Sequence, residues 1–391
     1  MKKQKDHILI INSGSSTLKF KIFHQADLKI ELNGIVEKIG LSGSFINISE
    51  NTSRRIIMKN YPSGIANHQE ALKEVMIYLK HWKSKIKIIG HRVVHGGSEF
   101  TQPTIINDKI LKKLEKFGQL APLHNPINLL CIKTCIELIP GIKNIAVFDT
   151  AFYKTIPDYA YLYPIPWEYY KNFNIRRYGF HGISHQYLAE QTEEKIKKPL
   201  KKIKLITCHL GSGCSITAIK FGQAIETSMG FTPLEGIMMS TRSGDIDPSI
   251  PIYLIRHLNM SLSEIEELLN KKSGLLGIFN YSKDMRDVMI AAGYRIPGYQ
   301  PPKKFTRDDK IKAKLALKMF IYRIVKYIGG YAMIMGGVDY IVFTGGIGER
   351  NATIRNLIIK EIKKSIKKVK TMAIPANEEL MIAREVKKII K

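Results

Sequence analysis

Short apolar runs alternate along the chain with longer stretches in which apolar residues recur every three or four positions. The short runs predict strands at residues 7–11, 18–23, 86–89, 145–148, 203–208 and 340–343. The longer stretches predict helices at residues 68–81, 108–117 and 311–335, and we expect Gly329-Gly330 to interrupt the last one. This alternation is typical of an α/β fold.

A strand–turn–strand pattern occurs twice. Residues 8–20 run from an apolar strand through a polar glycine turn into a second strand, and residues 205–217 do the same. One copy stands near the start of each half of the chain. The repeat therefore predicts a duplicated fold with a cleft between its halves.

Composition narrows the class of protein. With 391 residues, 45% of them hydrophobic and 24% charged, the chain is long enough for two globular domains. It has no apolar run of the roughly 18 residues that a membrane span needs. The apolar stretch after the charged start is too short for a signal peptide, and the four cysteines lack zinc spacing. We therefore expect an unexported, cytoplasmic protein without a membrane partner.

The formal net charge of +27 leaves nucleic-acid binding open as an alternative. However, the lysines are spread along the chain, and the densest runs, residues 195–204 and 360–370, lack the interleaved aromatics of a nucleic-acid platform. A solvated lysine surface is the preferred interpretation, with no specific nucleic-acid partner. The same charge would steer anionic substrates toward the protein.

Polar or glycine residues follow four of the predicted strands. Arg92 follows the third strand and Asp149 follows the fourth, while glycine loops follow the strands that end at residues 208 and 343. In open α/β sheets, ligands bind just beyond the carboxyl ends of the strands. The four segments therefore predict one ligand-binding crevice.

Glycine-rich loops predict phosphate binding, because a backbone without side chains can approach phosphate oxygens closely. The loops surround Gly14 and Gly211–Gly213, and a plain hairpin turn is the alternative for either one. No Gly-Lys dipeptide occurs, which excludes a Walker A loop. The third glycine run, at residues 345–349, could open a slot for an adenine ring.

Charged residues in turns complete the candidate site. Arg92 and Arg242 lie in glycine-flanked loops, and guanidinium is the natural partner of carboxylate and phosphoryl oxygens. Asp149 ends an apolar strand, so we expect an arginine or a metal-bound water beside it. His181 and His185 stand one helical turn apart, but the sequence offers no nearby third ligand for zinc.

The ordered motifs resemble the acetate kinase family, within the acetate and sugar kinase/Hsp70/actin superfamily, along essentially the whole chain. The segments that carry the resemblance are residues 12–19, 91–97, 148–152, 178–182, 239–245 and 375–379. The resemblance implies a duplicated two-domain actin-like ATPase fold with the active site in the interdomain cleft. The expected domains are residues 1–150, joined by 375–391, and residues 151–374.

The resemblance also implies roles for individual residues. The catalytic set is Arg92, Asp149, His181 and Arg242, and Arg92 would bind the substrate beside an apolar methyl pocket of Val94, Leu123, Phe180 and Pro233. Asn12 and Glu378 would hold Mg²⁺, or alternatively Mn²⁺. The nucleotide-binding set is Ser15, Lys19, His209, Leu210, Gly211, Ser212, Gly213, Asp284, Met285, Arg286, Gly345, Gly346, Ile347, Gly348 and Glu349.

The implied function is an acetate kinase that converts acetate and ATP into acetyl phosphate and ADP, and the implied assembly is a homodimer. The alternatives are a propionate or butyrate kinase and a non-catalytic ATP switch of the same superfamily. The chain departs from the family's usual pattern at Ser212, Glu226 and Ser240. Residues 296–302 form an added loop, and the stretch between residues 362 and 374 is shorter than usual.

Overall fold

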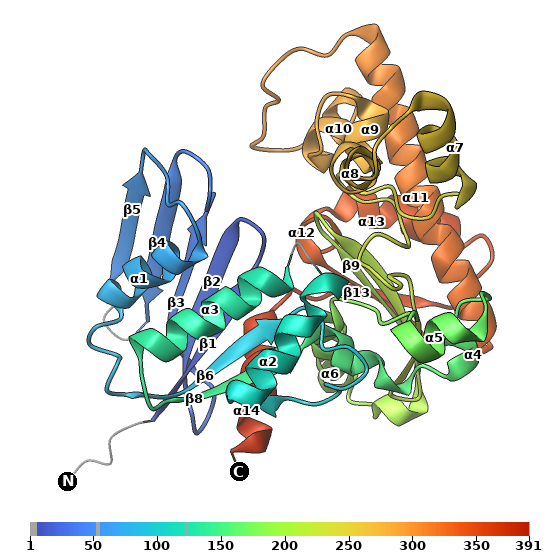
Figure 1. The fold of residues 1–391 in the computed structure, drawn as a ribbon. Coiled ribbons are helices and arrows are strands. Elements are labelled where there is room, and N and C mark those ends of the chain that lie inside the picture. The colour runs from blue at the N-terminus through green and yellow to red at the C-terminus, as the bar shows by residue number, and fades with distance from the viewer. Residues whose placement is uncertain (1–5, 52–54, 122–123, 391) are drawn as a thin grey trace. The chain divides into compact units, whose positions relative to one another are not determined.

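A computed structural model describes residues 6–51, 55–121 and 124–390. The chain divides into two compact units, Met1–Lys154 with Asn377–Lys391 and Thr155–Ala376. The last helix of the chain thus belongs to the first unit (Figure 1). Each unit is built around its own β-sheet.

The first unit holds an eight-stranded sheet in the order β5-β4-β3-β2-β1-β6-β8-β7. Its strands are β1 (His7–Ser13), β2 (Thr17–His24), β3 (Ile30–Glu37), β4 (Ser44–Glu50), β5 (Ile56–Tyr61), β6 (Ile86–Val93), β7 (Thr104–Ile105) and β8 (Lys143–Phe148). Its helices are α1 (His68–Tyr78), α2 (Asp108–Lys116), η1 (Phe117–Leu120), α3 (Asn125–Leu138), η2 (Asp149–Thr155) and α14 (Glu378–Ile389).

Strand β1 is buried on both faces, because helices cover both sides of this sheet. Leu9 and Ile11 share a core with α1 and α3. The other face, which carries Ile10 and Gly90, packs against Ile382 and Val386 of α14. A continuous apolar run is what a strand covered on both sides requires.

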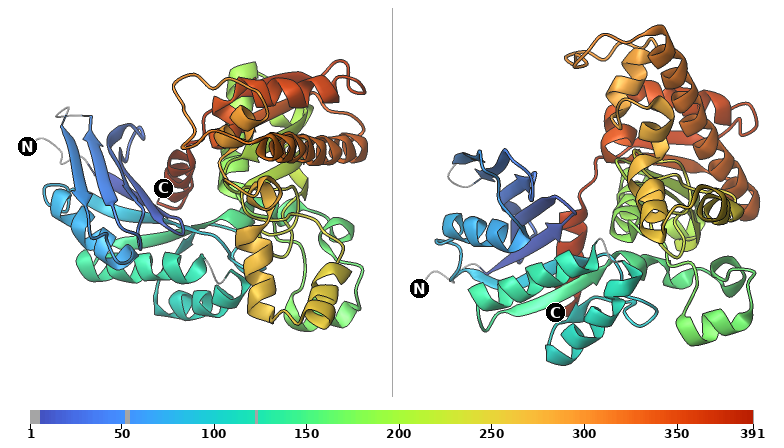
Figure 2. Two further views of the ribbon diagram at one scale, coloured as in Figure 1. Left: turned by 90° about the horizontal axis from the view of Figure 1, so that it is seen from above. Right: turned by 45° about the horizontal axis from the view of Figure 1, so that its top comes forward.

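The second unit holds a five-stranded sheet in the order β11-β10-β9-β12-β13. Its strands are β9 (Lys204–Leu210), β10 (Cys214–Lys220), β11 (Gln223–Thr227), β12 (Tyr340–Thr344) and β13 (Lys370–Ala373). Its helices are α4 (Asp158–Tyr161), α5 (Trp167–Phe173), α6 (Gly182–Ile196), η3 (Leu200–Lys202), α7 (Ser249–Leu258), α8 (Leu262–Glu267), η4 (Leu268–Lys272), α9 (Gly274–Phe279), α10 (Met285–Ala291), α11 (Arg307–Met335), α12 (Gly345–Arg350) and α13 (Ala352–Ile362). Figure 2 shows α11 as the long helix of this unit.

The predicted repeat is present in both sheets. Strands β1 and β2 pair antiparallel around the first glycine turn, and β9 and β10 pair antiparallel around the second. Each hairpin continues into a third antiparallel strand, β3 or β11, and each first strand has a parallel neighbour, β6 or β12. The series β3-β2-β1-β6-β8 therefore matches β11-β10-β9-β12-β13, which confirms the duplicated α/β fold.

Two expectations about glycines were wrong. Helix α11 runs through Gly329 and Gly330 without a break, because its buried side chains continue past them at Tyr331, Ala332 and Met335. The run that begins at Gly345 forms the short helix α12 where a loop was expected. Across the described residues, no helix combines the length and the apolar character needed to cross a membrane.

Candidate active site

The first unit gathers charged groups where its parallel strands end. Asn12 lies near the end of β1, Arg92 near the end of β6, and Asp149 directly after β8. These three strands are neighbours and run parallel, so their carboxyl ends meet at one edge of the sheet. The alternation of apolar strand and polar terminus thus brings together residues that are far apart in the sequence.

Arg92 is the centre of this cluster. Its Nε and Nη2 donate to Oδ2 of Asp149 at 3.1 and 2.6 Å, and its Nη1 donates to Oδ1 of Asn12 at 3.2 Å. Asp149 is 1% exposed, so the arginine expected beside it is present. Burial opposes the charged form of Arg92, but the carboxylates of Asp149, Glu378 and Glu379 together outweigh burial and raise the Arg92 pKa.

Helix α14 adds two more carboxylates. The amide nitrogen of Asn12 donates to Oε2 of Glu378 at 3.1 Å and to Oε1 of Glu379 at 2.8 Å. Lys21 pairs with Glu379 at 3.0 Å and donates to Asn377 Oδ1 at 2.8 Å. Glu379 and Lys21 were missed by the sequence analysis, although Glu379 follows a predicted ligand directly and Lys21 shares a strand face with Lys19.

The first glycine turn is held by neighbouring side chains. Nε2 of His68 lies 2.8 Å from the carbonyl oxygen of Gly14, and Asn128 donates to both the carbonyl and the hydroxyl of Ser13. Ser15 and Lys19, the predicted phosphate partners, are exposed. His68 and Asn128 carry no local motif, so only the fold could reveal their role.

The residues of the predicted methyl pocket belong to different units. Val94 is buried in the first unit, and its backbone N–H donates to Oδ1 of Asn128 at 3.1 Å. Phe180 is buried in the second unit, where the Pro233 carbonyl accepts a hydrogen bond from Arg242. Leu123 lies outside the described residues.

His181 begins helix α6 in a left-handed backbone conformation, with φ 58°. A residue other than glycine rarely adopts this conformation, and such strain is typical of functional sites. Its Nδ1 lies 2.9 Å from the Ser215 hydroxyl, and its ring stacks on His209 with 4.3 Å between the ring centroids. Packing and hydrogen bonding together fix the orientation of this imidazole.

Ser215 also links His181 to a second buried histidine. The Ser215 hydroxyl lies 2.8 Å from Nε2 of His185, whose Nδ1 lies 2.7 Å from the Thr207 hydroxyl. Burial, with a smaller contribution from His209, lowers the pKa of His185 well below its ordinary value, so His185 is neutral. The sequence could show the spacing of the two histidines but not the serine that connects them.

The second glycine turn meets His181 and Arg242. A Cβ atom on Gly213 would lie 3.4 Å from Nε2 of His181 and 3.6 Å from Nη1 of Arg242. Glycine therefore lets the backbone of this turn approach both side chains closely. This convergence of three predicted residues comes from the loops after β9 and β11 and from the start of α6.

Arg242 differs from Arg92 in its partners. Its Nη1 donates to the Pro233 carbonyl at 3.3 Å and contacts Met239 Sδ at 3.8 Å, and no acid pairs with it among the residues that the structure describes. Burial lowers the pKa of Arg242. A half-buried guanidinium whose protein partners are neutral favours the binding of an anion.

Ion pairs and hydrogen bonds hold the loop that carries Arg242. Nη1 of Arg177 donates to the carbonyl of Thr227, and Arg177 pairs with Glu226 and Glu235. Asp245 accepts from the N–H of Gly236 at 2.7 Å and from the Tyr327 hydroxyl at 2.6 Å. The Glu226 that departs from the family pattern thus supports this loop.

A pocket of about 820 Å³ in the second unit collects much of the predicted nucleotide set. The predicted residues that line it are Gly211, Ser212, Asp284, Met285, Arg286, Gly346 and Ile347. The sequence analysis missed its other lining residues, Ser240, Lys283, Arg295, Ile296, Pro297, Arg350, Asn351, Ala352 and Thr353. Its size and its excess of basic side chains suit a phosphorylated ligand of nucleotide size.

Eight residues of the predicted nucleotide set do not line this pocket: Ser15 and Lys19 belong to the first unit, and six others belong to the second. These six are His209, Leu210, Gly213, Gly345, Gly348 and Glu349. Leu210 is buried in β9, and a Cβ atom on Gly345 would lie 2.6 Å from its carbonyl oxygen, so Gly345 packs α12 against the glycine turn. Glu349 accepts from the N–H of Ala376 at 2.8 Å.

The loop at residues 296–302 reaches the pocket. Ile296 and Pro297 line it, and the Tyr299 ring lies against the guanidinium of Arg286 at 4.2 Å. Arg286 is fixed by Asp284, at 2.6 Å between Nη2 and Oδ2. The loop therefore shapes one side of the pocket through a predicted nucleotide-binding residue.

Comparisons with known proteins show the family to which the chain belongs. The family model of the acetokinase family matches residues 7–366. The acetate kinase of Caldicellulosiruptor saccharolyticus is 44% identical over 415 aligned residues, covering 98% of this chain and 99% of the relative. That of Thermoanaerobacterium thermosaccharolyticum is 45% identical with the same coverage.

Two solved structures are similar over the whole fold. The Porphyromonas gingivalis acetate kinase has a TM-score of 0.85 and 35% identity, covering 99% of this chain and 100% of that one. A propionate kinase from Francisella tularensis has a TM-score of 0.86 and 38% identity, covering 97% and 98%. The predicted kinase fold is thereby confirmed, and the chain belongs to the acetokinase family.

Proposed function

We propose that this chain is an acetate kinase, which reversibly transfers the γ-phosphoryl group of ATP to acetate. The observation that carries the proposal is the anion site of the second unit, where Gly213, His181 and Arg242 meet and Arg242 has only neutral partners among the described residues. A phosphoryl group with charge spread over three oxygens supplies the anion that this site lacks.

The chemistry needs no general base. A carboxylate oxygen of acetate attacks the γ-phosphorus, and the bond to the β–γ bridging oxygen breaks as ADP leaves with the electron pair. Because acetate is already an anion, no proton has to be removed. The protein contributes alignment and charge compensation around a loose transition state. His181 would donate a hydrogen bond to the transferred group, and Arg242 would neutralise its charge.

The first unit supplies the groups for the carboxylate substrate. Arg92 is oriented by Asp149 and Asn12 and would bind acetate or the phosphoryl group, with Val94 two residues further along the chain. Asp149 would stand beside the attacking oxygen. The buried Val94 side chain would contact the methyl group.

The acidic cluster of the first unit fits a divalent cation. The amide oxygen of Asn12 and the carboxylate of Glu378 are hard oxygen ligands of the kind that Mg²⁺ and Mn²⁺ prefer. The two residues are neighbours, because the amide nitrogen of Asn12 donates to Oε2 of Glu378 at 3.1 Å. The cation, when bound, would neutralise charge on the phosphates of ATP.

ATP would occupy the basic pocket of the second unit. Asp284, Met285 and Arg286 and the start of α12 would contact the adenosine, and the turn at residues 209–213 would hold the phosphates. We further propose that the protein is cytoplasmic and that it forms a homodimer. Sedimentation of the purified protein would test the homodimer.

An acyl-phosphate assay tests the proposal directly. The purified chain is incubated with ATP, Mg²⁺ and acetate, propionate or butyrate, and the acyl phosphate is trapped with hydroxylamine. We expect the highest kcat/KM with acetate and measurable turnover of propionate, because one methylene changes discrimination by about 1–3 kcal/mol.

Each rival predicts a different assay result. A higher kcat/KM for propionate would identify a propionate kinase, the activity named for the similar Francisella tularensis structure. Nucleotide binding without any acyl phosphate would indicate an ATP switch. The groups that favour catalysis over a switch are Arg92, Asp149, His181 and Arg242, because a switch needs no carboxylate clamp.

A further inference from the structure

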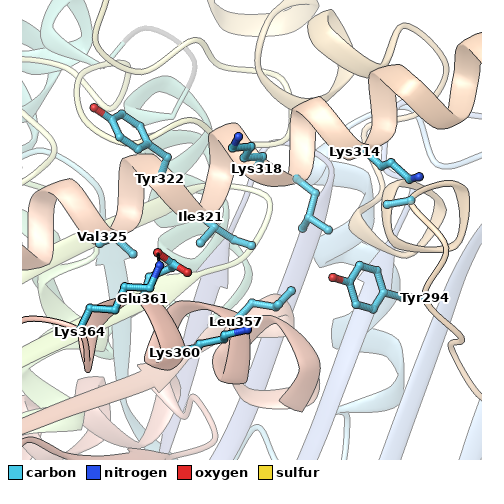
Figure 3. A pocket seen from close by; sticks show the side chains of 12 residues that line it. Tyr294, Lys314, Lys318, Ile321, Tyr322, Val325, Leu357, Lys360, Glu361 and Lys364 are labelled. Carbon is cyan, nitrogen blue, oxygen red and sulfur yellow. Dashed lines mark hydrogen bonds and ion pairs between the residues drawn. The ribbon is translucent and has the colours of Figure 1, made fainter. Parts of the chain in front are cut away.

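A second cavity lies in the second unit, apart from the nucleotide pocket. Its volume is about 620 Å³, and it lies between α11 and α13, with Tyr294 at one end and Lys364 toward the other (Figure 3). Its lining consists of Ala292, Tyr294, Lys314, Leu317, Lys318, Ile321, Tyr322, Val325, Leu357, Lys360, Glu361 and Lys364. None of these residues has a role in the proposed kinase reaction.

The cavity has an apolar floor. Leu317, Ile321 and Val325 follow one another at a spacing of four residues and therefore share one face of α11. Leu357 of α13 faces them across the cavity (Figure 3). The floor extends over three turns of α11, a length of about 16 Å from Lys314 to Val325 at 1.5 Å per residue.

The rim of the cavity is basic. Lys314 and Lys318 of α11 and Lys360 of α13 are exposed, and none of the three forms an ion pair within the described part of the chain. The one acid of the lining, Glu361, is paired with Lys364 at 2.6 Å. The rim therefore carries a net positive charge, and the floor below it is apolar.

An apolar floor below unpaired lysines fits an amphiphilic anion. The apolar body of such a molecule would cover Leu317, Ile321 and Leu357, and its anionic head would contact the ammonium groups at the rim. The volume lies within the range of small-molecule sites, about 300–1,000 Å³. A protein partner would need an interface of roughly 20–30 residues on each side, more than these twelve provide.

Two helices connect this cavity to the nucleotide pocket. Met285, at the start of α10, lines the nucleotide pocket, and Ala292, directly after the end of α10, lines the second cavity. Thr353 and Leu357 of α13 stand one turn apart and line the nucleotide pocket and the second cavity respectively. A ligand that shifts α10 or α13 would therefore act on both sites.

We propose that the cavity between α11 and α13 binds a small amphiphilic carboxylate and that its occupancy changes the affinity of the nucleotide pocket. The head group lies at Lys314, Lys318 and Lys360, and the chain lies along the floor. Because coupling between two sites is reciprocal, bound nucleotide changes the affinity for the amphiphile by the same factor. This coupling rests on the proposed nucleotide site, whereas the binding itself does not.

Decanoate, used below its micelle concentration, is the probe. Binding to the whole chain is measured by titration calorimetry, with decanol as the uncharged comparison. The test variant carries Lys314→Glu and Lys360→Glu, and the matched control carries Lys326→Glu, an exposed α11 lysine outside the lining. We expect saturable binding of decanoate, about tenfold weaker binding to the test variant, which corresponds to about 1.4 kcal/mol, and unchanged binding to the control.

Three outcomes would overturn the binding proposal: no saturable binding, equal binding of decanol and decanoate, or equal loss in the Lys326→Glu control. A second measurement follows the affinity of a fluorescent ADP analogue with and without decanoate. An affinity that decanoate leaves unchanged would overturn the coupling. A chain that binds decanoate but no ADP analogue would refute the proposed nucleotide site, while the amphiphile site would stand.

Discussion

At the scale of single residues, the two candidate arginines have opposite environments. Arg92 is bound to Asp149 and Asn12, so its charge is compensated within the protein. Arg242 contacts only a carbonyl and a thioether among the described residues. The charge of Arg242 is therefore available to an anionic ligand. Its removal should lower the turnover rate more than the stability of the fold.

We predict that Arg242→Ala lowers kcat by about 10³–10⁵, the range found when an arginine that stabilises a transferring phosphoryl group is removed. The melting temperature should change little, because no ion pair of Arg242 is lost. Initial rates and thermal unfolding of parent, Arg242→Ala and Arg242→Lys check this. Turnover close to the parent's in the alanine variant would contradict the assigned role.

His91 provides a residue-scale test of burial. Its Nε2 lies 2.8 Å from Oδ1 of Asn144, whose amide nitrogen donates to the Ile142 carbonyl, so the Asn144 oxygen accepts from Nε2–H. Among the residues that the structure describes, Nδ1 of His91 has no hydrogen-bond partner, and a proton there would be buried without an acceptor. Burial lowers the His91 pKa from 6.5 to about 4.

Because the folded pKa of His91 lies below the unfolded value, the unfolded chain binds a proton first as the pH falls. The neutral His91 therefore contributes to the free energy of unfolding in full above about pH 6.5. Roughly 3 kcal/mol of that free energy is lost as the pH falls from 6.5 to 4. Urea unfolding at several pH values should therefore show a shallower pH dependence for His91→Gln than for the parent. Parallel curves for the two proteins would refute the argument.

At the scale of elements, periodicity predicted the central strands of both sheets, because these strands are apolar and buried, but it did not predict the outer strands β3, β4, β5, β7, β11 and β13. The predicted strand at residues 340–343 is β12 (Tyr340–Thr344), for example, and the predicted helix at 108–117 is α2. The glycines misled the prediction in α11, because apolar side chains on both sides of Gly329-Gly330 keep the helix packed. Tertiary packing outweighs the low helix propensity of glycine here.

The same pair of glycines predicts a gain in stability. A Cβ atom at Gly329 or Gly330 would meet nothing within 4 Å, and neither residue has a positive φ. Gly329→Ala and Gly330→Ala should therefore each stabilise the chain by about 0.5–1 kcal/mol. Gly345→Ala is the matched control and should destabilise, because its φ is +78° and its Cβ would contact the Leu210 backbone. Denaturant midpoints give the comparison.

The candidate site could be predicted only in part. Strand ends and glycine turns pointed to Arg92, Asp149 and Gly213, because such positions have a local signature. Lys283, Arg295 and Arg350 line the nucleotide pocket but lie in segments that resemble any exposed basic stretch. They become recognisable only when α10, α12 and the loop at residues 296–302 fold together.

At the scale of the whole molecule, a net charge of +27 acts on anionic substrates before any contact forms. ATP and acetate are both anions, so the protein's field should raise their association rates. Salt shortens the range of that field to about 10 Å at 0.1 M ionic strength. Two groups of cations contribute to this field, the dispersed surface lysines and the basic residues of the nucleotide pocket. Variants in the pocket and variants elsewhere on the surface distinguish their contributions to the salt dependence.

We predict that kcat/KM for ATP falls severalfold as ionic strength rises from about 0.02 to 0.3 M, whereas kcat at saturating substrate stays nearly constant. If the pocket dominates, Lys283→Gln with Arg295→Gln should flatten the salt dependence, while Lys326→Gln, outside both cavities, should leave it intact. Equal flattening by Lys326→Gln would assign the effect to the summed charge. A kcat/KM independent of salt would show that the excess of lysine has no part in capturing ATP.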